Sequence, residues 1–275
     1  LAILNARITK KTFKRWNLFP KTAKKIFNKF DLCLTSNLET KKYLLKFKAQ
    51  NIFFKGNLKL INTIENKKDF HKNKDFLTRN RFWVAASTHP GEERLCLEVH
   101  EVLKKKFTNI ITVIIPRHIY RANNIKKICD SLGLNSKIHE LNDEMTNENE
   151  IFIVNHYGSL NQYFNYAKSV FMGKSMLKSL QEVGGQNPID PARLGCKIYH
   201  GKYVYNFNEI YELLEKNNIS KTISNIDELV QYLSFDLKNV EKDNNNFDTI
   251  INNLGNKTLD EVMKSINKFL FNVSN

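Results

Sequence analysis

The sequence has few of the features that define membrane-spanning, disulfide-stabilised or zinc-binding proteins. No run of about 18 apolar residues occurs, which is the length that a membrane-spanning helix requires. Apolar residues make up 41% of the chain, enough for a packed core. The few cysteines are far apart and form no CxxC pair, so we expect reduced thiols rather than disulfides or a zinc site. They are Cys33, Cys96, Cys129 and Cys196.

Several short catalytic and binding motifs are also missing. No GxGxxG follows an expected strand, which disfavours a nicotinamide dehydrogenase, and no GxxxxGK[ST] marks a phosphate-binding P-loop. No HExxH or paired Cys/His spacing indicates a metal, and no GxSxG indicates a serine hydrolase. We therefore expect no metal site and no bound cofactor.

Acidic residues are in the minority, at 28 against 43 Lys and Arg, giving a formal charge of +15. This excess indicates affinity for anions, whether nucleic acid, a phosphorylated ligand or an acidic membrane surface. A nucleic-acid-binding protein should show a recognition helix, RNP-like aromatic residues or a concentrated basic stripe. The Lys residues here are spread along the chain, so nucleic acid is the least favoured of these partners.

Strand and helix patterns alternate along most of the chain, which predicts an α/β fold with parallel sheets. One alternation occupies residues 1–60, and a second begins at Arg81 and continues to the end. The Lys-rich stretch between them, residues 61–80, has little apolar periodicity and is the best linker candidate. We expect a first domain at 1–60, a linker at 61–80 and a second domain, including the final helices, at 81–275.

Four loops follow the carboxyl ends of expected parallel strands in the second domain. They are Ser87–Gly91, Pro116–His118, Tyr157–Ser159 and Gly184–Asp190. Ligands of open α/β sheets bind at this edge. The side chains suited to a phosphate or a sugar there are the hydroxyls, imidazoles and guanidinium of Ser87, Thr88, His89, Arg117 and His118.

The fourth loop has its own local signature. Gly184 and Gly185 allow a tight turn and close approach of a ligand. Asn187 is a favoured N-cap and Pro188 suits the first helical position. Asp190 then falls in the first turn, and Gly195 should end the helix after about two turns. An ordinary capped helix would give the same pattern as a helix start that binds an anion.

Residues 9–30 are basic and rich in aromatic residues, and Pro20 should divide them into two helices. One interpretation is a surface that meets anionic lipid, because basic residues flank the aromatic ones. The other is an amphipathic helix pair with a solvated Lys face. The basic residues are Lys10, Lys11, Lys14, Arg15, Lys21, Lys24 and Lys25.

The expected second domain contains three more specific segments: residues 84–93 (VAASTHPGEE), the triplet Pro116–His118, and residues 184–188 (GGQNP). Together they resemble the Kdo (3-deoxy-D-manno-oct-2-ulosonic acid) transferase family of lipid A assembly. Shorter matches cover nearly the whole chain in the family's order: NARI at 5–8, FKRW at 13–16, GNLK at 56–59 and NF at 206–207. The resemblance implies a glycosyltransferase B fold of two Rossmann-like domains, the first incomplete here, with the donor nucleotide in the second.

The resemblance also implies site residues. Pro116 and Arg117 are expected to touch the CMP of CMP-Kdo. Residues 157–159, which are Tyr157, Gly158 and Ser159, match the family's Met-Gly-Glu loop. Its Asn-Pro-Leu-Glu corresponds to Asn187, Pro188, Ile189 and Asp190. Asp190 is one methylene shorter than the usual Glu, and Ser159 replaces a carboxylate, so two donor contacts differ from the family pattern.

The implied reaction moves Kdo from CMP-Kdo to a lipid A precursor in lipopolysaccharide biosynthesis, at the cytoplasmic face of the inner membrane, without a metal. The chain opens at Leu1 without Met, and we expect it to be the remainder of a longer protein. The catalytic base should lie in the absent amino-terminal part, so this chain alone is expected to be inactive. Alternatives are another two-domain nucleotide-sugar glycosyltransferase, an epimerase, or a nucleic-acid-binding protein.

Overall fold

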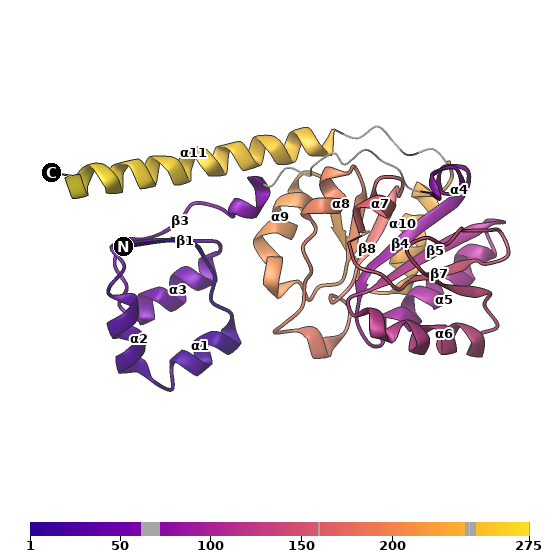
Figure 1. Cartoon of the computed structure of the whole chain (residues 1–275), viewed down its shortest axis with the longest axis horizontal. Helices are drawn as coiled ribbons and strands as arrows, with labels where there is room; N and C mark the ends of the chain where they lie inside the picture. The colour runs from indigo at the N-terminus through magenta and orange to yellow at the C-terminus, as the bar shows by residue number, and fades with distance from the viewer. Residues whose placement is uncertain (62–71, 159, 240–241, 243–245, 275) are drawn as a thin grey trace. The chain divides into compact units, whose positions relative to one another are not determined.

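The computed structural model describes residues 1–61, 72–158, 160–239, 242 and 246–274 (Figure 1). The chain divides into two compact units. Unit 1 comprises residues 1–63 and 249–275, and unit 2 comprises residues 64–248. No helix in the described part of the chain has the length and hydropathy needed to cross a membrane.

Unit 1 is built on a three-stranded parallel sheet in the order β1-β2-β3, at Ala2–Ala6, Leu32–Thr35 and Ile52–Phe54. Between β1 and β2 lie α1 (Lys10–Trp16) and α2 (Pro20–Phe27), while α3 (Leu38–Lys46) joins β2 to β3. The division into two helices at Pro20 is confirmed, since Pro20 begins α2, where its missing N–H costs nothing. The helices pack through stacked aromatic pairs, Phe13 on Tyr43 and Phe27 on Phe47.

The final helix, α11 (Phe247–Ser274), belongs almost entirely to unit 1, so the expected domain 81–275 is wrong at its end. Val262 of α11 is buried in one cluster with Leu32 and Leu34 of β2. Glu261 also accepts a hydrogen bond from the ammonium of Lys55 at 3.1 Å. The sequence places this helix after unit 2, but its apolar side is buried against the sheet of unit 1.

Unit 2 contains one seven-stranded sheet, all parallel, in the order β10-β9-β8-β4-β5-β7-β6. The strands are β4 (Arg81–Thr88), β5 (Ile110–Pro116), β6 (Ser136–His139), β7 (Ile151–Val154), β8 (Ser169–Met172), β9 (Lys197–His200) and β10 (Ser220–Thr222). The central strands β4 and β5 are buried along nearly their whole length, as expected for a sheet covered on both faces.

Helices cover both faces of this sheet (Figure 1). One face carries α5 (Glu92–Lys104), α6 (Ala122–Ser131) and α10 (Ile226–Asp236), whose apolar side chains share a cluster with Trp83 of β4. The other face is packed by Phe76 on Phe152 and by Tyr211 on His200. These residues belong to α4 (Lys74–Arg79) and α9 (Asn208–Lys216); α7 (Leu160–Phe164) and α8 (Ile189–Arg193) complete the unit.

The second half of the expected linker 61–80 is part of unit 2. Leu77 of α4 is buried, and the buried Asn73 accepts a hydrogen bond from the backbone of Met145 at 2.8 Å. Its carboxamide also donates to the carbonyl of Asp143 at 3.0 Å. Residues 62–71 lie outside the described part. The stretch is polar because α4 is short and buries only one apolar side chain, that of Leu77, so its sequence shows little sign of a helix.

Candidate functional site

The carboxyl ends of β4, β5, β7 and β8 lie at one edge of the unit 2 sheet, because all pairings are parallel. The four loops expected to carry the site therefore begin at this edge or continue from it. The backbone after β4 packs closely against its neighbours at this edge. Ser87 has a left-handed backbone (φ 55°), and the register shifts so that Thr88 pairs with Pro116. A Cβ on Gly173, just after β8, would lie 2.6 Å from the Cα of Thr88, so only glycine fits.

Glu92, the first residue of α5, connects the loop after β4 to the loop after β8. Its carboxylate is completely buried and accepts four backbone N–H groups. One comes from His89 at 3.0 Å, and the others come from consecutive residues after β8. Those three donors are Lys174 at 2.6 Å, Ser175 at 2.8 Å and Met176 at 3.0 Å. Burial of a carboxylate is compensated only when its oxygens are fully hydrogen-bonded, which is the case here.

Glu93, the next residue, forms a buried ion pair with Arg121 in the segment after β5. The guanidinium donates to both carboxylate oxygens, with Nη2 at 3.1 Å from Oε2. Such a two-point contact fixes the orientation of both side chains. The two adjacent glutamates thus hold the loops after β5 and β8 against the start of α5.

Cationic side chains surround His89 at this edge. Burial, with the charge of Lys174 as the next cause, lowers the pKa of His89 to about 4. His118, Arg121 and Arg117 lower it further. The rings of His89 and His118 are 6.0 Å apart and nearly perpendicular. The backbone N–H of Arg117 donates to the carbonyl of Thr88 at 3.0 Å, which places these loops together. The low pKa of His89 thus reflects its burial first and the neighbouring basic side chains second.

The segment 184–190 also lies beside His89 and Lys174. The N–H of Gly185 donates to the carbonyl of Lys174 at 2.7 Å, and the carboxamide nitrogen of Gln186 lies 3.5 Å from Nε2 of His89. Both glycines are required, because a Cβ on Gly184 would lie 2.0 Å from the carbonyl oxygen of Tyr203, and Gly185 has φ 90°.

The expected helix after this turn is shorter than the sequence indicated. α8 covers five residues and its N-cap is Pro188, not Asn187. Asn187 instead accepts a hydrogen bond from the N–H of Ile189 at 3.3 Å. The expected stop is confirmed, with Gly195 following α8 at φ 78°. A helix of little more than one turn has a small dipole, so we assign no anion-binding role to its start.

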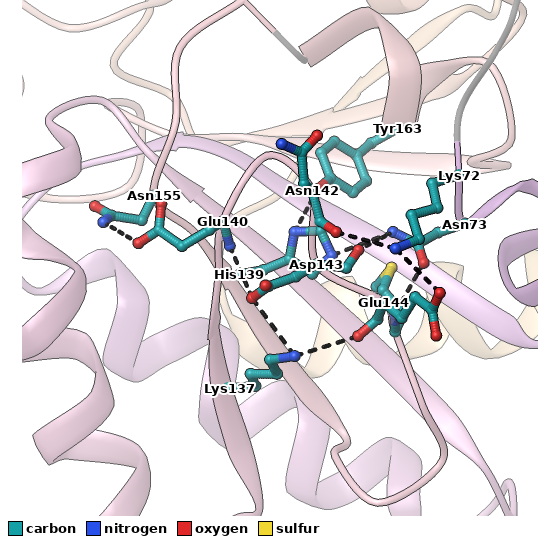
Figure 2. Close-up of polar contacts among 11 residues, drawn as sticks. Lys72, Asn73, Lys137, His139, Glu140, Asn142, Asp143, Glu144, Asn155 and Tyr163 are labelled. Carbon is teal, nitrogen blue, oxygen red and sulfur yellow. Dashed lines mark hydrogen bonds and ion pairs between the residues drawn. The ribbon is translucent and has the colours of Figure 1, made fainter.

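The loop after β7 is only partly described. The aromatic ring of Tyr157 is 72% exposed and Gly158 has φ 84°, while Ser159 lies outside the described residues. The neighbouring strand β6 ends at His139, which is buried in a polar network shown in Figure 2. Asn73 and Tyr163 contact its two ring nitrogens at 3.2 and 3.3 Å. This network holds the end of β6 against the segment that precedes α4.

The expected site residues differ in how far their side chains are buried. Arg117, His118 and Tyr157 are exposed, and His89 is half-buried, so these side chains are open to a ligand. The side chains of Thr88, Pro116, Pro188 and Ile189 are buried, so a ligand could meet only their backbone. Asn187 and Asp190 are partly exposed and remain candidates.

Sequence reasoning did not single out Lys174, Arg121, Glu92 or Glu93 as site residues. The two glutamates were visible as an acidic pair directly after Gly91 at a helix start, which is the one signal that could have identified them. Within the described residues, no group of three or more His, Cys, Asp or Glu side chains is placed to hold a metal ion. The arrangement gathers basic side chains at the carboxyl edge of the sheet, where they can bind an anion.

Comparison with known proteins bears on this site. Residues 1–62 match the family model of 3-deoxy-D-manno-octulosonic-acid transferase (Kdo transferase). The 3-deoxy-D-manno-octulosonic acid transferase of Aquifex aeolicus is 27% identical over 215 residues, which is 78% of this chain and 56% of that protein. The enzyme of the same name from Rickettsia prowazekii is 28% identical over 280 residues, covering 98% of this chain and 59% of its own length. The chain thus spans somewhat over half the length of these relatives.

Among solved structures, the C-terminal CMP-Kdo binding domain of WaaA from Acinetobacter baumannii matches with a TM-score of 0.54 and 19% identity. The match covers 68% of this chain and 91% of that domain, and it concerns the fold. The expected α/β architecture with parallel sheets, of glycosyltransferase B type, is confirmed. The resemblance to Kdo transferases is confirmed as well.

Proposed function

We propose that this relative of the Kdo transferases binds CMP-Kdo at the carboxyl edge of the unit 2 sheet and serves in Kdo transfer to a lipid A precursor. The single observation that carries the proposal is the cationic cluster around His89. Lys174 lies there on the loop that Glu92 joins to His89, and Arg117 and His118 lie on the loop after β5. A sugar nucleotide joined through a phosphate is anionic.

The chemistry that such a cluster can perform is stabilisation of the leaving group. The acceptor hydroxyl attacks the anomeric carbon of Kdo, the bond from that carbon to the phosphate oxygen breaks, and CMP leaves with the electron pair. Arg117 can bind two phosphate oxygens through its forked guanidinium, so it can stabilise the charge that develops on CMP. A base must take the proton of the acceptor hydroxyl. We assign no residue of this chain to that role.

The proposal also covers the cytidine part of the donor. We propose that cytidine lies toward the loops at 157–158 and 187–190. Tyr157 offers an exposed ring for stacking, and the carboxylate of Asp190 offers an acceptor for ribose hydroxyls. These positions follow from the matches to the family's Met-Gly-Glu and Asn-Pro-Leu-Glu segments.

Titration calorimetry with CMP, UMP and AMP tests this assignment on the 275-residue chain. We expect CMP to bind most tightly, because the loops at 157–158 and 187–190 correspond to segments of a cytidine-dependent family. Equal affinity for all three nucleotides would contradict cytidine specificity. Preference for UMP would instead support the alternative, a two-domain transferase or epimerase that uses a uridine nucleotide.

The acceptor side of the proposal concerns unit 1. Leu18 and Phe19, in the turn between α1 and α2, are 74% and 67% exposed. Trp16, by contrast, packs edge-on against Phe27 in the unit 1 core. The surrounding basic residues are Lys10, Lys11, Lys14, Arg15, Lys21, Lys24 and Lys25. We propose that this turn meets the anionic cytoplasmic face of the inner membrane, where a lipid A precursor would be presented.

A further inference from the structure

Lys174 has a backbone conformation that lysine rarely adopts. Its φ is 59°, in the left-handed region where Cβ approaches the following carbonyl oxygen and glycine is favoured. A lysine kept in this conformation costs stability relative to glycine, and such strain is found most often at functional sites. The same cost applies at Lys48, with φ 57°, which follows α3 in unit 1.

The backbone of Lys174 joins the two loops that border the cationic cluster. Its N–H donates to the buried Glu92 at 2.6 Å, and its carbonyl accepts from Gly185 at 2.7 Å. Glu92 holds His89 by the same carboxylate oxygen, and Gln186, next to Gly185, lies 3.5 Å from the His89 ring. Lys174 is therefore fixed between the turn after β4 and the segment 184–190.

The charges near Lys174 differ in how far they are already compensated. Glu92 is occupied by four backbone N–H groups, and Arg121 is paired with the buried Glu93. Arg117 is exposed at the end of β5. Lys174 has the largest electrostatic effect of any charge on the pKa of His89, ahead of the two arginines. The charge of Lys174 therefore contributes to the positive potential at His89.

We propose that Lys174 is an anion-binding residue of this site, which holds the phosphate of the nucleotide donor together with Arg117. The inference rests on the proposed function, since it assumes a nucleotide donor at this edge. It also gives a reason for lysine at a left-handed position. The backbone must turn there to reach Glu92 and Gly185, and the partly exposed Lys174 is thereby fixed at the edge where the donor is proposed to bind. A lysine ammonium serves as a compact charge for phosphate.

The test compares Lys174→Gly with the matched control Lys48→Gly, using CMP as the probe. Each variant removes one positive charge and places glycine in a left-handed conformation, so both should raise the midpoint of thermal unfolding. We expect Lys174→Gly to weaken CMP binding at least about 10-fold, as for the loss of a charge-assisted hydrogen bond. Lys48→Gly should change it less than about twofold, because Lys48 belongs to unit 1 and its exposed charge is screened by salt.

Two further measurements distinguish loss of the Lys174 charge from a change in the conformation of its loop. Lys174→Arg keeps the charge and should retain most of the affinity. In an NMR titration of His89, its pKa should rise above about 4 in Lys174→Gly and stay unchanged in Lys48→Gly. Unchanged CMP affinity in Lys174→Gly would overturn the inference while leaving the proposed function in place. An equal loss in both glycine variants would also overturn it. Absence of CMP binding by the unsubstituted chain would overturn both.

Discussion

The carboxylate of Glu92 accepts the backbone N–H of Lys174 at 2.6 Å, joining residues 82 positions apart in the chain. Because Glu92 also holds His89, this contact aligns the loop after β4 with the loop after β8. The buried carboxylate of Glu92 thus holds the loops that carry the basic residues of this edge. The residues that fix the loops, Glu92 and Glu93, differ from those proposed to bind the ligand, Arg117 and Lys174.

The first prediction follows from the four backbone donors on Glu92. Glu92→Gln keeps the side-chain length but replaces one oxygen by an NH₂ group, which faces two N–H donors and leaves them unsatisfied. Each buried unsatisfied group costs about 1–3 kcal/mol, so the two donors together should lower the free energy of unfolding by about 2–6 kcal/mol. Urea denaturation measures it. Glu98→Gln, on the exposed side of the same helix, should change it by less than about 1 kcal/mol.

Arg117 and Arg121 should have opposite phenotypes although they are four residues apart. Arg117 is exposed, so Arg117→Ala should leave stability nearly unchanged and weaken CMP binding by about 10-fold or more. Arg121 is paired with the fully buried Glu93, so Arg121→Ala leaves an uncompensated carboxylate and should cost about 3–5 kcal/mol of stability. Calorimetry and urea denaturation on both variants decide this. Equal effects on binding would mean that Arg117 has no special access to the ligand.

Stability should decline with acid in a window set by His89. Its folded pKa is about 4, below the ordinary 6.5, so the unfolded chain binds more protons between these values. The free energy of unfolding should therefore rise with pH from about 4 to about 6.5 and level off above. Burial lowers the pKa of His100 and His200 in the same direction. His89→Gln should flatten part of this dependence, measured by denaturant unfolding at several pH values. If the free energy of unfolding varies with pH as steeply in His89→Gln as in the unsubstituted chain, His89 is not the source of the pH dependence.

The proposed membrane contact of unit 1, the turn at Leu18 and Phe19, can be tested without the donor site. Leu18→Gln combined with Phe19→Gln should weaken sedimentation with vesicles of anionic phospholipid, and added salt should weaken it further. Leu45→Gln is the control, because Leu45 is 56% exposed in the same unit but lies on α3. Binding that survives both the double substitution and high salt would exclude this turn as the contact.

Much of the donor edge could be predicted from the sequence, for a physical reason. Alternating strands and helices require parallel strands, and parallel strands bring their loops to one edge, so His89, Arg117 and Gly185 could be grouped without coordinates. What joins those loops could not be predicted. Glu92 acts on backbone donors more than 80 positions away, and no residue pattern encodes which N–H groups a buried carboxylate will meet.

Other elements were missed because they carry weak local signals. β6 and β10 are short edge strands, and only half of the residues in β6 are buried, so little apolar pattern remains. α10 has a clear buried side with Leu229, Val230 and Leu233, yet it follows a polar stretch that reads as a loop. The partner of α11 is set by tertiary packing on β2, which chain order does not show.

The location of CMP on the protein tests the central claim most directly. Backbone amide chemical shifts of the isotope-labelled 275-residue chain should be followed during addition of CMP. The account predicts that the largest changes fall on His89, Arg117, Lys174 and Gly185, at the carboxyl edge of the unit 2 sheet. Changes concentrated at the opposite edge, around residues 147–150, or on unit 1 would contradict it.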